Sequence, residues 1–176
     1  MDLHSYVRPL YQDVDGISRF EAIERVAAIA RRLYAPPPDE ARAFELLLIF
    51  HGLGNWLEKL GNLSRTALAV EGVTERELRR TAASIQRLGA PESDAERALA
   101  AAILVDNAGV RGLAEELSRA RREGRTVADV VRAALAEDER PEWLGAEARA
   151  MLDRRRARRR EFCRAILEEL TTERLP

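Results

Sequence analysis

Two residues of this chain, His51 and Asp106, carry side chains that could hold a divalent cation. His51 directly follows the apolar run Phe44–Phe50, and Asp106 shares a helical stripe with Leu99 and Ile103. Imidazole nitrogens and carboxylate oxygens are both ligands of divalent metals. Because two ligands are too few for a metal that activates water, such a site would need two or more further ligands.

The stripe that contains Asp106 predicts that its carboxylate faces inward, where an unpaired charge would cost several kcal/mol. A partner is therefore expected, and either His51 or an arginine could be that partner. His51 also has a structural interpretation, because an imidazole at a helix end can serve the last carbonyls of that helix.

Polar and aromatic residues follow the apolar run in a segment that contains Gly52, Gly54 and Gly61. These glycines predict a kinked or broken helix, and a site could open at the break. The candidate ligand-binding residues there are Asn55, Trp56, Lys59 and Arg65. Arg65 could bind a phosphate or carboxylate with two hydrogen bonds, and Trp56 could stack on a base. The same residue types also suit a solvated connecting segment.

Six arginines within residues 154–160 form the densest charge cluster. Such a run on about two helical turns could neutralise nucleic-acid phosphates. No aromatic residue is interleaved for stacking and glutamates follow closely, so a solvated face with ion pairs is favoured over a nucleic-acid interface. Some arginines are nevertheless expected to turn toward carboxylates, with Glu45 and Asp106 as candidate acceptors. Arg155 and Arg158 are the arginines concerned, because they share one helical stripe with the apolar residues Met151, Phe162 and Ile166.

The composition predicts a single all-α domain. The chain has 176 residues, of which 46% are hydrophobic and 34% are charged, with only 10 Gly and 7 Pro. This length allows one hydrophobic core without disulfides or metals, and the composition excludes a disordered chain. The formal net charge of -1 provides no overall field that would attract nucleic acid or an anionic membrane.

Cysteine usage and the N-terminus bear on the compartment. Cys163 is the only cysteine, which excludes an intrachain disulfide and a zinc site built on several thiolates. The first residues lack the pattern of a signal peptide, and no apolar stretch approaches the roughly 20 residues that span a bilayer. A cytoplasmic protein without a membrane anchor is expected.

Apolar periodicity and helix breakers predict an N-terminal arm over residues 1–17 and one domain over residues 18–176 with about seven helices. The expected helices cover residues 18–34, 39–50, 63–71, 75–88, 94–108, a segment that begins at Thr126, and 145–170. Two of them begin with capping boxes, Thr74 with Glu77 and Ser93 with Glu96. The sequence shows no strand pattern and no internal repeat.

Four stretches follow one another in an order similar to that of a known family: Ala22-Ile23-Glu24-Arg25-Val26, His51-Gly52, Ile103-Leu104-Val105-Asp106-Asn107-Ala108-Gly109, and Arg160-Glu161-Phe162 through Leu170. On these residues the chain resembles the HD-domain superfamily of metal-dependent phosphohydrolases, in particular its small single-domain bacterial members. In that family a first helix carries His-x-x-Arg-Val, a second ends in His-Asp, a later helix carries an aspartate before glycines, and the last helix carries spaced Arg, Phe and Leu. The resemblance covers about residues 15–170 and implies an HD-domain-like helical bundle.

The four metal ligands of the family correspond to Ala22, His51, Gly52 and Asp106. Ala22 and Gly52 offer neither lone pairs nor charge, so the resemblance implies a degenerate metal site with no metal bound. It also implies a contact between the two surviving polar residues, His51 and Asp106.

The expected function is therefore that of a catalytically inactive relative, a pseudoenzyme, that binds a small anionic ligand or a protein partner. The alternative implied by the family is a phosphohydrolase that uses Mn, Mg or Fe to act on a nucleotide or another phosphate ester. A third hypothesis is a nucleic-acid accessory protein that uses the arginine run. A homodimer is also expected, to which the apolar segment around Trp143-Leu144 could contribute.

Overall fold

The structure is a computed structural model that describes residues 3–11, 19–138 and 140–172. These residues form ten α-helices and three short 3₁₀-helices without any strand, which confirms the all-α fold class. Across these described helices, none is long and apolar enough to cross a membrane. The chain divides into two compact units, unit 1 (residues 1–102) and unit 2 (residues 103–176), and the boundary falls within one helix, α7.

Unit 1 is built around a central helix, α3 (Ala41–Phe50). Its apolar run is buried nearly all round, as the sequence predicted, because Phe44 and Leu46–Phe50 all lie inside. Helix α3 packs against its neighbours α2 and α6. The other helices of this unit are α1 (Leu3–Val7), α2 (Arg19–Leu33), α4 (Gly54–Glu58), α5 (Asn62–Val70), α6 (Glu75–Gln86) and the first part of α7 (Asp94–Asn107).

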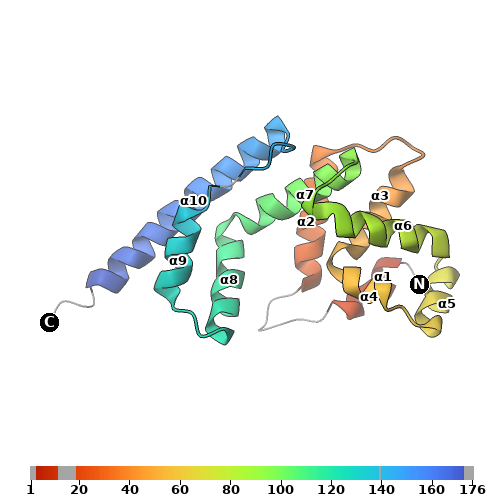
Figure 1. Ribbon diagram of the computed structural model, residues 1–176, viewed down its shortest axis with the longest axis horizontal. Helices are drawn as coiled ribbons and strands as arrows, with labels where there is room; N and C mark the ends of the chain where they lie inside the picture. Colours follow the sequence, from red (N-terminus) through yellow and green to blue (C-terminus); the bar gives the residue numbers. More distant parts are fainter. Residues whose placement is uncertain (1–2, 12–18, 139, 173–176) are drawn as a thin grey trace. The chain divides into compact units, whose positions relative to one another are not determined.

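Unit 2 contains the end of α7 and three further helices, α8 (Val110–Arg122), α9 (Val127–Ala136) and α10 (Ala146–Thr172). Helices α8 and α9 pack against each other and against α10, which is the longest helix described (Figure 1). Their shared core contains Leu113, Val130, Val131 and Cys163. The single thiol is therefore a core side chain of this unit.

Three of the ten α-helices, α1, α4 and α8, were not among the seven that the sequence predicts. Helices α1 and α4 have five residues each, which is too short for a periodic pattern. Helix α8 places Leu113 and Ala120 in the core, but two glycines at its start, Gly109 and Gly112, weaken the helical signal. Residues 3–11 of the predicted arm place Val7 and Tyr11 in the core of unit 1, and residues 12–17 lie outside the described part.

Both predicted capping boxes are confirmed. At the start of α6, the Thr74 hydroxyl accepts a hydrogen bond from the Glu77 amide, and the Thr74 amide donates to the Glu77 carboxylate at 2.7 Å. Ser93 and Glu96 exchange the same two bonds at the start of α7, each at 3.2 Å.

Glu96 differs from an ordinary capping residue because it is only 1% exposed. Its carboxylate accepts hydrogen bonds from Arg87 at 2.5 Å and from the Glu92 amide at 3.0 Å. Burial alone would raise the pKa of Glu96. The bonds from Arg87, from the amides of Glu92 and Ser93 and from the Ser84 hydroxyl outweigh burial and lower the pKa to about 2. This carboxylate is therefore charged and ties the end of α6 to the start of α7.

We expect the stability of unit 1 to depend on pH through Glu96. Since its pKa in the folded state lies below the ordinary value of 4.5, its contribution is complete above about pH 4.5 and is lost as the pH falls toward about 2. Urea unfolding at several pH values should show a smaller acid-induced loss of stability for Glu96→Gln than for the unmodified protein. Glu92→Gln is the matched control, because Glu92 pairs with the same arginine but is 76% exposed. Equal pH dependence of Glu96→Gln and the unmodified protein would contradict the assignment.

Candidate functional site

His51 lies directly after α3 and is bound to the last turn of that helix. Its Nδ1 atom is 2.7 Å from the carbonyl oxygen of Leu48, as expected for the capping interpretation. Burial lowers the pKa of His51, and the hydrogen bond to Leu48 opposes this only in part, so the imidazole is neutral at neutral pH. A neutral ring that donates through Nδ1 keeps a lone pair on Nε2, the form in which histidine binds metals.

The space beside Gly52 is occupied by side chains from two other segments. A Cβ atom at this position would lie 2.7 Å from Cε1 of Tyr11 and 2.9 Å from Cδ1 of Ile23. The Tyr11 ring is fixed there, because its hydroxyl donates a 2.6 Å hydrogen bond to the carbonyl oxygen of Ile49. Burial raises the pKa of Tyr11 far above its usual value, so the hydroxyl stays protonated as a donor. Gly52 is thus a point of close packing between α3, α2 and the N-terminal segment.

Replacing Gly52 with alanine should lower the free energy of unfolding of unit 1 by about 1–3 kcal/mol, since the new methyl group overlaps a ring that cannot rotate away. Trp56 fluorescence during urea unfolding, in a Trp143→Phe background, reports on this unit. Gly61→Ala is the matched control, because no atom lies within 4 Å of a Cβ atom there. Equal stabilities of the two alanine variants would show that the Tyr11 contact is not tight.

At the helix break, where the sequence predicted that a site could open, the side chain of Ile85 occupies the space beside Gly54. A Cβ atom on Gly54 would lie 2.9 Å from Cγ2 of Ile85, so α4 and α6 approach each other closely at this glycine. The break itself is present, since α3 ends at Phe50 and α4 begins at Gly54. The glycines therefore allow helices to pack rather than opening a cavity where they stand.

The metal positions implied by the family resemblance are divided between the units. Ala22 in α2, His51 and Gly52 belong to unit 1, whereas Asp106 near the end of α7 belongs to unit 2. The predicted contact between His51 and Asp106 would join the two units, and it stays a prediction. Within the described ranges, no three His, Cys, Asp or Glu side chains gather into a group that could hold a metal ion.

Asp106 is bound by an arginine of α10, one of the partners that the sequence left open. The Nη1 atom of Arg155 lies 3.1 Å from the Asp106 carboxylate and 3.2 Å from the Val105 carbonyl oxygen. Asp106 is 8% exposed, as its inward stripe predicted. The guanidinium supplies the positive charge that a buried carboxylate needs. Glu45, the other candidate acceptor, is bound in bidentate fashion by Arg31 of α2, at 3.0 and 2.6 Å.

Three of the four predicted ligand-binding residues, Trp56, Lys59 and Arg65, have described side chains, and their surroundings differ. Trp56 packs on the core of unit 1 with its ring stacked on Phe50 at 6.4 Å, and Lys59 is exposed at the end of α4. The side chain of Asn55 lies outside the described part. A shared ligand site of these residues stays a prediction.

Arg65, the fourth predicted ligand-binding residue, lines a pocket of about 290 Å³ between α4, α5 and α6. Its guanidinium is already engaged there, because it forms an ion pair with Glu75 and donates from Nε to the Leu60 carbonyl oxygen at 3.1 Å. The hydrogen bonds from Arg65 and Arg79 hold the pKa of Glu75 below its usual range. An anion at Arg65 would have to share this guanidinium with Glu75.

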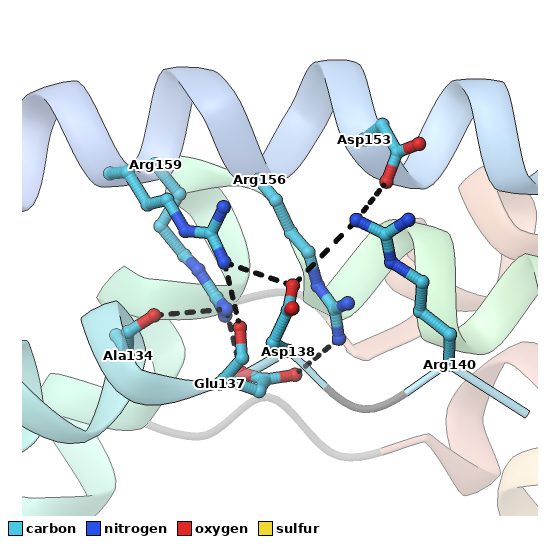
Figure 2. Close-up of polar contacts among 8 residues, drawn as sticks. Ala134, Glu137, Asp138, Arg140, Asp153, Arg156 and Arg159 are labelled. Carbon is cyan, nitrogen blue, oxygen red and sulfur yellow. Dashed lines mark hydrogen bonds and ion pairs between the residues drawn. The ribbon is translucent and has the colours of Figure 1, made fainter.

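Three arginines of the run, Arg156, Arg159 and Arg160, bind two acids that follow α9. Arg156 and Arg159 are 2% and 3% exposed, and both bind Glu137, which directly follows α9. Their Nη2 atoms lie 3.2 and 2.6 Å from the Glu137 carboxylate, and Arg160 binds the neighbouring Asp138 at 3.1 Å. Figure 2 shows the guanidiniums of Arg156 and Arg159 reaching from α10 toward this acidic pair. The sequence predicted inward arginines but missed both acceptors, which directly follow α9.

The other arginines of the run border a second feature of α10. Arg154, Arg155 and Arg158 line a surface pocket of about 180 Å³ together with Met151. No carboxylate lines this pocket, whereas each of the other pockets described in the two units has at least one acidic side chain in its wall. Phe162, on the same stripe, is 46% exposed. The arginine-lined pocket is the most strongly basic feature among the described residues.

The segment proposed for a homodimer, Trp143-Leu144, is largely used within unit 2. Leu144 is only 3% exposed, and Trp143 is partly buried. Whether this segment contributes to a homodimer stays a prediction. No protein-family model, no curated protein and no solved structure matches this chain.

Proposed function

We propose that this protein is a degenerate relative of the HD-domain superfamily that binds an anionic ligand or a protein partner and does not hydrolyse phosphate esters. The observation that carries the proposal is the close packing at Gly52, where Tyr11 Cε1 would lie 2.7 Å from any Cβ atom. An aspartate ligand has no room at this position unless Tyr11 moves. The order of the four family-like stretches supports the ancestry, and α2 lies against α3 as the resemblance requires.

The environment of Asp106 supports the same proposal. In a metal site a carboxylate offsets the charge of the cation, and here Arg155 provides a permanent positive charge at 3.1 Å from that carboxylate. A divalent cation at this carboxylate would have to compete with the guanidinium. We therefore expect no resident metal and derive no catalytic step through one.

The alternative is a phosphohydrolase that depends on Mn, Mg or Fe. The orientation of His51 favours it, because the Nδ1 contact with Leu48 leaves Nε2 suited to a metal. Metal analysis of protein purified without chelator, together with turnover of a panel of nucleotides and phosphate monoesters, separates the two functions. Our proposal predicts far less than one metal ion per chain and no turnover. Near-stoichiometric metal with turnover that disappears in Asp106→Ala would establish the alternative.

A variant that returns the family's ligand types gives a second test. In Ala22→His/Gly52→Asp, we expect no gain of Mn²⁺ binding in a calorimetric titration, since the Tyr11 ring still occupies the space beside residue 52. Adding Tyr11→Ala to this variant removes that obstacle. Tight Mn²⁺ binding by the Ala22→His/Gly52→Asp variant with Tyr11 intact would contradict the steric argument.

The proposal also includes the compartment. A single cysteine that is buried in the core suits the reducing cytoplasm of a bacterial cell. Colocalisation of a tagged chain with a cytoplasmic marker after cell fractionation tests this part of the proposal.

A further inference from the structure

We infer that the arginine-lined pocket of α10 is a binding site for the phosphate group of a small phosphorylated molecule. This inference rests on the proposed function, because it identifies the anion that a non-catalytic domain would bind. The first observation is the lining of the pocket: three arginines, Arg154, Arg155 and Arg158, line it, and no carboxylate does. Guanidinium groups bind phosphate oxygens in bidentate fashion and keep their charge at any physiological pH.

The charge of the site is not neutralised. Arg155 pairs with Asp106, but neither Arg154 nor Arg158 has an ion-pair partner among the described residues. The three arginines carry three positive charges, and the Asp106 carboxylate offsets one of them. The site therefore keeps an excess of about two positive charges. A phosphate monoester carries about -1.5 to -2 charges at neutral pH, so the two match. By contrast, Arg156, Arg159 and Arg160 of the same run are all paired with acids.

One of the three arginines is held in place before any ligand arrives. All the hydrogen bonds of Arg155 come from its Nη1 atom, which donates to the carbonyl oxygens of Val105 and Asp106 and to the Asp106 carboxylate. Its Nε and Nη2 atoms make none of these bonds and can donate to an anion. A fixed arginine loses less side-chain entropy on binding than a mobile one, which favours a specific site over a diffuse charged surface.

The size of the pocket limits the ligand. At about 180 Å³ the pocket lies below the roughly 300 Å³ of typical sites for drug-sized molecules. It is large enough for a phosphate group, whereas the remainder of the ligand would extend over the neighbouring surface of α10. Met151 offers an apolar contact at the rim.

The test is a titration of the full chain, in low salt and with chelator present, with inorganic phosphate, glycerol 3-phosphate and glycerol. We expect saturable binding of both phosphate compounds near one equivalent and none of glycerol. In Arg154→Gln/Arg158→Gln the affinity should fall at least about tenfold, because each lost charge-assisted hydrogen bond is worth about 1.5–3 kcal/mol. Arg164→Gln is the matched control, since Arg164 is an exposed arginine of the same helix that does not line the pocket. Thermal unfolding verifies that each variant is folded.

Two outcomes would overturn the inference: absence of saturable phosphate binding by the unmodified protein, or equal affinities of the unmodified protein and the Arg154→Gln/Arg158→Gln variant. A third arm uses a single-stranded oligonucleotide of about a dozen nucleotides at several salt concentrations. Binding of the oligonucleotide alone, with steep salt dependence, would identify a nucleic-acid surface and reject a small-molecule site. Because chelator is present, these results are separate from metal-dependent turnover, which would reject the proposed function instead.

Discussion

Glu137→Ala is expected to lower the free energy of unfolding of unit 2 by about 3–5 kcal/mol, the cost of removing a carboxylate that binds two buried cations. Two guanidiniums that are 2% and 3% exposed, those of Arg156 and Arg159, bind this carboxylate. Burial alone would raise the pKa of Glu137, but the hydrogen bonds and charges of Arg159 and Arg156 outweigh it and hold the pKa below the usual range. The carboxylate is therefore charged and is shared by the two buried cations.

The two tryptophans make the measurement specific, because Trp56 belongs to unit 1 and Trp143 to unit 2. In a Trp56→Phe background, urea unfolding followed by Trp143 fluorescence reports on unit 2. Asp138→Ala is the matched control, since Asp138 is the next residue but is 65% exposed and pairs with partly exposed arginines. Exposed ion pairs contribute about 0–1 kcal/mol, so the control should lose far less stability.

Removal of the two buried cations separates a charge effect from a loss of packing. In the Glu137→Ala background, Arg156→Met/Arg159→Met should recover much of the lost stability, because apolar side chains of similar length need no counter-charge. If Glu137→Ala lost no more stability than Asp138→Ala, the buried arginines would not depend on Glu137. If the methionines failed to recover stability, packing rather than charge would explain the loss.

The helices of this fold could be predicted wherever local chemistry determines them. Thr74 and Ser93 each satisfy free amides at a helix start, and the partner glutamate stands three residues later in both cases. The apolar run of α3 likewise requires burial whatever surrounds it. These signals lie within one turn of the helix that they define, so a single sequence contains them in full.

The inward face of α10 could not be predicted in the same way. The predicted stripe includes Phe162, which is 46% exposed, whereas the buried positions are Leu152, Arg156, Arg159 and Cys163, one residue further along each turn. Because arginines stand on both faces of this helix, apolar periodicity discriminates weakly between them. The choice depends on Glu137, a partner that lies outside the helix.

The surroundings of Gly52 in the candidate site could not be predicted from the sequence either. From the sequence it is a missing ligand, and nothing within the local pattern indicates what replaces the lost side chain. The structure places Tyr11 beside it, a residue from a segment with no sustained period, and the contact joins distant parts of the chain. The pairing of Asp106 with Arg155 was within reach, because an inward carboxylate requires a partner and the arginine run was a visible source.

Gly112→Ala is expected to destabilise unit 2 by at least about 3 kcal/mol, although alanine favours a helix over glycine by up to about 1 kcal/mol. The junction between α7 and α8 is too tight for a side chain at this point. A Cβ atom on Gly112 would overlap the carbonyl oxygen of Asn107 and would lie 2.8 Å from its Cα atom. A backbone overlap of this size cannot be relieved by a change of rotamer, so the junction itself must move. Asp106 adjoins Asn107, and its contact with Arg155 would be displaced with it.

Gly109→Ala is the matched control for this prediction. It places the same methyl group in the same junction, but the nearest atoms, among them Cδ of Arg155, lie at an ordinary contact distance of 3.7 Å. Its backbone, with φ of -85°, also suits alanine. In the Trp56→Phe background, Gly109→Ala should therefore change the stability of unit 2 by less than about 1 kcal/mol. A Gly112→Ala variant as stable as Gly109→Ala would mean that helix propensity outweighs the steric term, and that the junction does not hold Asp106 in place.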